Sequence, residues 1–250
     1  MLRGVLLVVC VLLLLTFAAT FAQQSSEVGT ANLYRYGELL QQHHIELTKS
    51  ALLRALKNSD EAVRYLAAMK LAEDKSVDAI PAIEEALAVE RVLRDRVNIA
   101  LALGLLGDQT GPTELKKVCA GTNFVPEFRL YAVRYMFDLH FQKDEDCLHA
   151  AEEIVESKKI DSGDRISALE LLQRFQTLTA EESDKVLKLV LKRLEDSEPV
   201  VRMAASNAVA SLGNASAIPY LEAAIAREQD ESVRSVFERD VKKLQEKTQP

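Results

Sequence analysis

The side chains best suited to metal chemistry in this sequence are few and poorly placed for it. Of the four histidines, His43 and His44 are adjacent, so on a helix they would point about 100° apart and could not both face one ion. His140, Cys147 and His149 lie closer together, but no pair among them has a recognised zinc-ligand spacing. We therefore predict no metal site and no bound cofactor.

Carboxylates and nucleophiles also fail to form a recognisable catalytic motif. The sequence has no glycine-rich phosphate loop, no G-x-S-x-G elbow and no H-E-x-x-H pair. Adjacent acids such as Glu84 and Glu85 fall on the polar faces of expected helices, where their charge favours solubility. The pattern predicts a protein that is not an enzyme.

Arginine is the one chemically capable residue that recurs with a regular period. Each copy follows an acidic or turn-forming cluster and precedes an apolar helix, at intervals of 32, 33, 36, 37 and 32 residues. Intervals of about 20–50 residues are typical of stacked repeats. We expect these cations to pair with acids of their own or the adjacent repeat; the alternative is a row of cations that faces a ligand. The predicted ladder consists of Arg64, Arg96, Arg129, Arg165, Arg202 and Arg234.

The elements that would position these arginines are pairs of helices. A helix that begins near Pro199 carries Arg202 and ends at Gly213, and the next helix begins near Pro219. This unit and residues 79–87 (AIPAIEEAL) resemble HEAT repeats, and the resemblance covers roughly residues 47–244. It implies an all-α fold, an α-solenoid of about six HEAT-like helix pairs. Residues 33–47 are expected to add an N-terminal capping helix.

Cys119 and Cys147 remain outside the N-terminal segment, and an even number of cysteines favours a disulfide in an exported protein. Both fall in the first helices of consecutive repeats, which are neighbours in a solenoid. However, Cys119 lies late in its helix and Cys147 lies early, which strains the limit of about 7 Å between Cα atoms. A disulfide and two small buried thiols therefore both remain open.

Residues 1–22 have the pattern of a secretory signal peptide. Arg3 precedes a dense apolar run, and small residues stand before Gln23 at the expected cleavage point. The alternative is an uncleaved anchor, because an uncharged segment of this length spans about 30 Å of hydrocarbon. Either reading predicts export, to the periplasm or the medium. Residues 23–32 are expected to be a flexible leader and residues 33–247 the HEAT-like repeat domain.

The charge of the chain excludes some classes of partner. The formal net charge is −7, so the protein has no general electrostatic attraction to nucleic acids or to anionic lipid surfaces. We expect no nucleic-acid partner. Contact with a membrane is expected only through residues 1–22, and only if they are not cleaved.

The helical phase set by each arginine predicts which side chains could meet a partner. HEAT-like arrays resemble one another in lining a concave wall with their second helices. The side chains three and seven residues after each arginine, such as Ile99 and Leu103, should face the core. Those at positions +1 and +5 should then form an exposed apolar ridge, unless the phase is off by one position and the ridge is core. The predicted partner-binding residues are Tyr65, Met69, Val97, Leu101, Leu130, Tyr131, Arg134 and Tyr135.

Together these features predict an exported, non-enzymatic HEAT-repeat scaffold that binds a protein or peptide on its concave face. One alternative is a protein that handles a small molecule or chromophore, by analogy with the HEAT-like bilin lyases. Another is a membrane-tethered or oligomeric structural subunit. A pigment bound after purification would favour the first alternative, and an intact N-terminus in membrane fractions would favour the second.

Overall fold

The computed structural model describes residues 35–175 and 179–248. Within these ranges every regular element is a helix and no strand occurs, which confirms the all-α prediction. None of the helices in the described ranges is both long enough and apolar enough to cross a bilayer. The predicted signal peptide and leader, residues 1–32, lie outside the described residues.

The chain divides into two compact units, residues 1–88 and 89–250. The described part of the first unit begins with a short helix, α2, and both α2 and α3 contact α4. The helix α2 occupies the place of the predicted capping helix, but it ends early because His44 adopts a φ of 58°. The elements of this unit are α2 (Arg35–Gln42), α3 (Lys49–Ala55), α4 (Glu61–Glu73), η1 (Val77–Ala79) and α5 (Ile80–Val89).

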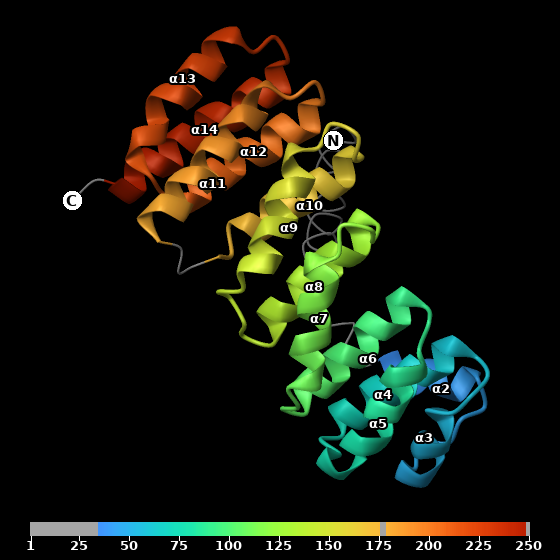
Figure 1. Ribbon diagram of the computed structural model, residues 1–250. Helices are drawn as coiled ribbons and strands as arrows, with labels where there is room; N and C mark the ends of the chain where they lie inside the picture. The colour runs from blue at the N-terminus through green and yellow to red at the C-terminus, as the bar shows by residue number, and fades with distance from the viewer. Residues whose placement is uncertain (1–34, 176–178, 249–250) are drawn as a thin grey trace, which may run out of the picture. The chain divides into compact units, whose positions relative to one another are not determined.

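The second unit is a stack of helix pairs (Figure 1). Its second helices, α6, α8, α10, α12 and α14, form one row in which each helix contacts the next. After α2 the described ranges hold twelve α-helices, α3 to α14, the number that six helix pairs require. The bounds are α6 (Leu93–Leu105), α7 (Thr110–Ala120), α8 (Pro126–Asp138), α9 (Glu145–Glu156), α10 (Ser162–Leu172), α11 (Ala180–Lys192), η2 (Arg193–Glu195), α12 (Pro199–Leu212), η3 (Ala215–Ala217), α13 (Ile218–Arg227) and α14 (Glu231–Thr248).

Local sequence signals account for where the helices begin and end. The side chain of Asp60 accepts a hydrogen bond from the N–H of Ala62 (2.9 Å) and caps α4. Pro199 is the first residue of α12, a position where its missing N–H costs no intrahelical bond. The same helix ends at Gly213, whose φ of 73° a side chain would disfavour.

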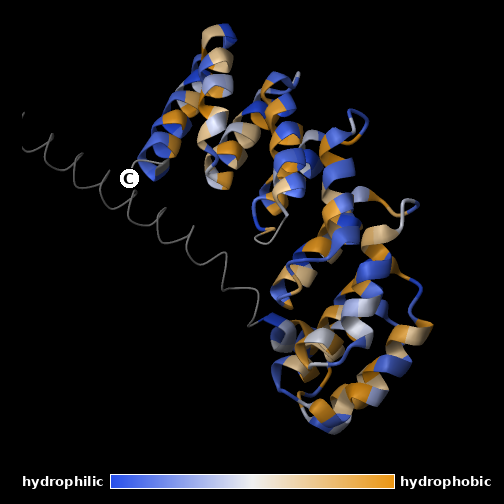
Figure 2. Cartoon of the chain, turned by 60° about the vertical axis from the view of Figure 1, so that its left-hand side comes forward, coloured by the Kyte–Doolittle hydropathy of each residue, from blue (hydrophilic) through white to orange (hydrophobic). Residues whose placement is uncertain are grey.

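The hydrophobic core follows the helical phase that the arginines set. Ile99 and Leu103 of α6 are fully buried, and so are Ala205 and Val209 at the matching positions of α12. The prediction that positions +3 and +7 face the core is therefore confirmed for these helices. Figure 2 shows hydrophobic and hydrophilic residues alternating along the helices, as expected of helices that bury one face and expose another.

Candidate partner-binding face

Each of the six recurring arginines is the fourth residue of a second helix. Four of them donate a hydrogen bond to the backbone carbonyl six residues earlier, in the turn that joins the two helices of the repeat. Arg202 bonds the carbonyl of Asp196 (2.9 Å), and Arg234 bonds that of Glu228 (2.6 Å). Arg64 and Arg96 do the same. The arginine thus donates to backbone carbonyls that have no partner within the helix that ends there.

Four of the six arginines, Arg96, Arg129, Arg165 and Arg202, pair with carboxylates of the following repeat. Arg202 forms a forked pair with Glu228, at 2.7 and 2.9 Å. Arg165 pairs with the carboxylate of Asp196. Asp196 therefore binds two arginines, since its backbone carbonyl also accepts from Arg202 of its own repeat. The other pairs are Arg96 with Glu114 (2.5 Å) and Arg129 with Glu153 (2.8 Å).

These partner acids are not the ones that the sequence placed beside each arginine. Asp60 and Asp230, which immediately precede their helices, cap them instead. A signal for two of the true partners was present, because Asp196 and Glu228 each stand six residues before an arginine. Glu153 carries no such marker, since it lies inside α9. The contacts of the arginines are those of an intramolecular ladder.

The acids of the ladder are held in their charged form. Burial raises the pKa of Asp196, but hydrogen bonds from Glu198 and Arg165 outweigh it, so that the pKa lies below its ordinary value. The hydrogen bond from Arg202 is the largest cause of the lowered pKa of Glu228. Burial raises the pKa of Glu114, but the hydrogen bond and the charge of Arg96 lower it further, so that the pKa of this acid also lies below its ordinary value.

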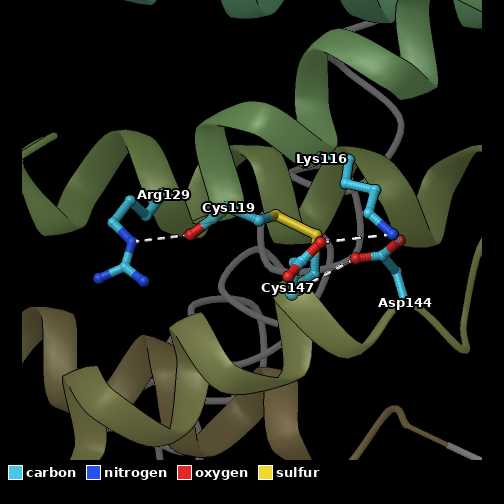
Figure 3. The surroundings of a disulfide bond; sticks show 6 residues. Lys116, Cys119, Arg129, Asp144 and Cys147 are labelled. Atoms are coloured by element: carbon cyan, nitrogen blue, oxygen red, sulfur yellow. Dashed lines mark hydrogen bonds and ion pairs between the residues drawn. A yellow bond between two sulfur atoms is a disulfide. The ribbon is translucent and has the colours of Figure 1, made fainter. Parts of the chain in front are cut away.

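A disulfide joins Cys119 of α7 to Cys147 of α9 (Figure 3). The two Cα atoms are 4.8 Å apart, because α7 and α9 pack together and bring the late and early positions level. Closing a loop of 28 residues stabilises the fold by about 3 kcal/mol in the chain-entropy model. Arg129 donates to the carbonyl of Cys119 (3.0 Å), so one ladder arginine binds the backbone of a disulfide cysteine.

The disulfide removes Cys147 from the zinc set considered above, because a disulfide sulfur is not a thiolate ligand. His149 instead lies 3.2 Å from the carboxylate of Glu152. Among the described residues no group of three histidine, cysteine or acidic side chains is placed to hold a metal ion.

The expected apolar ridge is wrong at four of its members. The exposed fractions are 4% for Met69, 1% for Val97, 7% for Leu101 and 5% for Leu130. At position +2 of α8, α10 and α12 the side chains of Tyr131, Ser167 and Ala204 are half-buried. The burial of position +1 differs between helices: Val97 and Leu130 lie in the core, whereas Ile166 and Met203 are half-buried.

The remaining predicted residues do reach the surface. Arg134 at position +5 is exposed, as are Glu170 and Asn207 in the following helices. Tyr131 and Tyr135 are half-buried, and so is Tyr65 in the first unit. We call the exposed and half-buried positions +2 and +5 of three neighbouring helices, together with Tyr135, the second-helix face. It comprises Tyr131, Arg134, Tyr135, Ser167, Glu170, Ala204 and Asn207.

An aromatic strip runs along α8 at one end of this face. The rings of Tyr131 and Tyr135 are nearly parallel, with centroids 6.3 Å apart. The ring of Phe128 lies 6.2 Å from that of Tyr131. The hydroxyl of Tyr135 donates to the side-chain oxygen of Asn98 on α6 (2.8 Å), which links two neighbouring second helices. The strip is therefore ordered by its own contacts before any partner arrives.

Acidic side chains surround Tyr131. Its hydroxyl donates to Glu127 (3.1 Å), and burial and Glu127 raise the pKa of the phenol. The carboxyl of Asp164 on α10 is close enough to act on the same phenol. Burial, and then the charges of Asp161 and Glu127, raise the pKa of Asp164. Arg134 opposes these acids, because its charge lowers the pKa of the same phenol.

Comparison with known proteins bears on the fold. Residues 157–240 match a family model described as HEAT repeats. This segment of the chain is similar to HEAT repeats. No curated protein sequence matches it. Among solved structures, the complex of CpcE and CpcF of phycocyanin lyase from Nostoc sp. PCC7120 is 23% identical, covers 78% of this chain and 76% of its own, and has a TM-score of 0.46.

The HEAT match covers only part of the ladder, because Arg64, Arg96 and Arg129 precede it, as the aromatic strip does. It contains Arg165, Arg202 and Arg234, so the ladder belongs to the repeated architecture. The aromatic strip, from Phe128 to Tyr135, precedes the matched segment. A feature that is not repeated is a better candidate for a local function than one that recurs in every HEAT-like pair.

Proposed function

We propose that this protein is an exported, non-enzymatic scaffold that binds a protein or peptide on its second-helix face. The observation that supports the proposal is the aromatic strip of Phe128, Tyr131 and Tyr135, which stays half-exposed beside an exposed Arg134. Tyrosine and arginine are the residue types that most often dominate binding energy at protein interfaces. A strip already ordered by Asn98 and by ring contacts would lose little side-chain entropy on binding.

The charge around the strip selects the chemistry of the partner. Glu127 on α8 and Asp164 on α10 both act on the phenol of Tyr131. Glu170, also on α10, belongs to the second-helix face. A basic side chain of a partner could rest on the tyrosine rings and approach these carboxylates at once. We therefore propose a segment with lysine or arginine beside apolar residues as the partner.

Export is the second part of the proposal and is supported by residues 1–22, whose pattern is that of a signal peptide. The test is the intact mass of the protein recovered after expression with its own N-terminus. A chain that begins at Gln23 supports cleavage and export, whereas a full-length chain in the membrane fraction supports the anchor instead.

The binding face is tested with two matched tyrosine variants and a peptide library. Tyr131→Ala removes the central ring of the strip, and Tyr220→Ala removes a ring that is 58% exposed on the first helix α13. Peptides selected on the unmodified protein should be basic and apolar. Their affinity should fall at least about 30-fold for Tyr131→Ala, the loss typical of a hot-spot residue, and should be unchanged for Tyr220→Ala.

Circular dichroism and thermal melting of both variants check that the helical stack is intact. Equal affinity of the selected peptides for both variants would contradict the second-helix face as the binding surface. A chromophore that absorbs visible light and copurifies with the protein would contradict the non-enzymatic assignment.

A further inference from the structure

A basic pocket lies where the loop between α9 and α10 meets the turn that follows α11. Its volume is about 340 Å³. Four cationic side chains line it against two carboxylates, which leaves an excess of two positive charges in a chain whose net charge is −7. None of its residues belongs to the second-helix face. The charged residues that line the pocket are Lys158, Arg165, Lys192, Arg193, Glu195 and Asp196.

Two buried guanidinium nitrogens at this pocket have no hydrogen-bond acceptor among the described residues. They are the Nε atoms of Arg165 and Arg193. Only 7% of the Arg165 side chain is exposed, so bulk water does not solvate this nitrogen. Burying an N–H donor without an acceptor is unfavourable, and a small shift of the side chain that opens this nitrogen to an acceptor in the pocket would remove that cost.

The other ladder arginines of the second unit show that the lack of an acceptor is particular to Arg165. The Nε–H of Arg96 donates to Glu114 and that of Arg202 donates to Glu228. The Nε–H groups of Arg129 and Arg234 donate to backbone carbonyls. Arg165 contacts Asp196 through Nη1 alone. The break in the pattern coincides with the basic pocket.

The two carboxylates at the pocket are already engaged. Asp196 accepts from Arg165 and from the N–H of Glu198 (3.1 Å). Glu195 pairs with Arg227 (2.9 Å), which adds a further cation beside the pocket. Lys158 and Lys192 are exposed at the rim. The donors that remain are therefore two arginine N–H groups and two ammonium groups.

We propose that this pocket is an oxyanion site whose ligand class is phosphate, either free or carried on a phosphorylated side chain. Phosphate offers several strong acceptor oxygens, and arginine N–H groups and lysine ammonium groups are its usual protein donors. The two arginine Nε–H groups hold the anion from the inner side of the pocket. Lys158 and Lys192 close it from the rim and balance a charge of about −2.

The test is a titration of the full chain with inorganic phosphate at constant ionic strength, with sodium chloride as the balancing salt. The melting temperature should rise in a saturable manner. In ¹⁵N–¹H spectra, the Nε–H signals of Arg165 and Arg193 should shift more than those of Arg202 and Arg234. A rise that chloride reproduces, or Nε–H signals that do not move, would overturn the proposal.

Two double variants of equal charge locate the site without touching the ladder. Lys158→Gln with Lys192→Gln removes both rim cations, and phosphate binding should weaken about tenfold or more, as expected for loss of charge-assisted bonds. Lys159→Gln with Lys188→Gln changes the net charge equally, at exposed positions that do not line the pocket, and binding should be retained. Equal weakening in both double variants would reduce the effect to net charge and overturn the site.

Phosphoserine, added in place of inorganic phosphate, distinguishes the two sources of the anion. Tighter binding of phosphoserine supports the site and assigns it to a modified protein chain. Equal or weaker binding supports the site and assigns it to the free anion. The outcome is independent of the second-helix face, since the peptide experiment with Tyr131→Ala does not involve this pocket.

Discussion

At the scale of single residues, the ladder arginine is a connector with two separate tasks. Arg202 closes its own turn through the carbonyl of Asp196 and joins the next repeat through the carboxylate of Glu228. Its side chain is 15% exposed and that of Glu228 is 7% exposed. A charged pair shielded from water to this extent interacts more strongly than one on the open surface.

Glu228→Gln should therefore destabilise the protein by about 1–2 kcal/mol, since the charge-assisted fork on Arg202 becomes a neutral hydrogen bond. The measurement is urea unfolding followed by circular dichroism. Glu222→Gln is the matched control, because Glu222 is exposed on α13 of the same repeat. Equal unfolding free energies for the two variants would show that the fork contributes nothing to stability.

At the scale of elements, the close approach of α6 and α7 depends on glycine. A Cβ added at Gly111 of α7 would fall well inside contact distance of the carbonyl oxygen of Ala100 and the amide nitrogen of Gly104, both on α6. These are backbone atoms and cannot rotate away. The two helices can lie this close only because position 111 lacks a side chain.

Gly111→Ala should destabilise the fold by about 1–3 kcal/mol, the usual cost of overpacking, in spite of the better helix propensity of alanine. Gly163→Ala is the control, because both glycines are the second residue of a helix. At Gly163 the nearest atom, Oδ1 of Asp161, lies 3.1 Å away on a side chain that caps α10 through the N–H of Asp164, so the added methyl group strains at most this one cap and no backbone atom. Thermal melting of both variants measures the difference, and a stable Gly111→Ala protein would refute the close approach.

At the scale of the whole molecule, the repeats are joined in series. In the second unit each second helix contacts the next one in the row, so stability spreads through nearest-neighbour junctions. Three of these junctions contain an acid with a lowered pKa: Glu114, Asp196 and Glu228. Protonating these acids weakens three junctions of one array, and the loss accumulates along it.

The direction of the pH effect follows from the lowered pKa values. An acid that ionises more readily in the folded chain stabilises it above its ordinary pKa, and this stabilisation is lost as the pH falls through the folded pKa. The ordinary values are 4.5 for Glu114 and Glu228 and 3.8 for Asp196. Asp164, whose pKa is raised, acts in the opposite direction, but it is outnumbered, because the pKa values of Asp78, Asp161 and Glu182 are lowered as well.

The melting temperature should therefore stay nearly level between about pH 7 and pH 5 and fall steeply below about pH 4. Melting curves at constant ionic strength measure the profile. The profile of Glu228→Gln should fall less steeply, because one of the three titrating junctions is absent. A melting temperature that rises towards pH 3 would contradict the assignment of these pKa shifts.

The sequence by itself determined the all-α class, the order of the helix pairs and the core phase of Ile99, Leu103, Ala205 and Val209. These properties are local and periodic: helix caps, apolar spacing and the arginine interval are each written within one repeat. The hydrogen bonds from the arginines to their own turns are local as well. Each joins an arginine to a carbonyl only six residues before it, at the start of the same helix.

The tertiary structure alone decided which acids pair with the ladder arginines and which side of each second helix meets solvent. It also decided which arginine N–H groups are buried without an acceptor among the described residues. Glu153 meets Arg129 from 24 residues away because α9 packs against α8. Val97 and Leu130 are buried although their spacing suited an exposed ridge, because a shift of about 100° separates position +1 from +2. Packing between repeats decides which face of each helix is turned inward, and no pattern within one repeat encodes that choice.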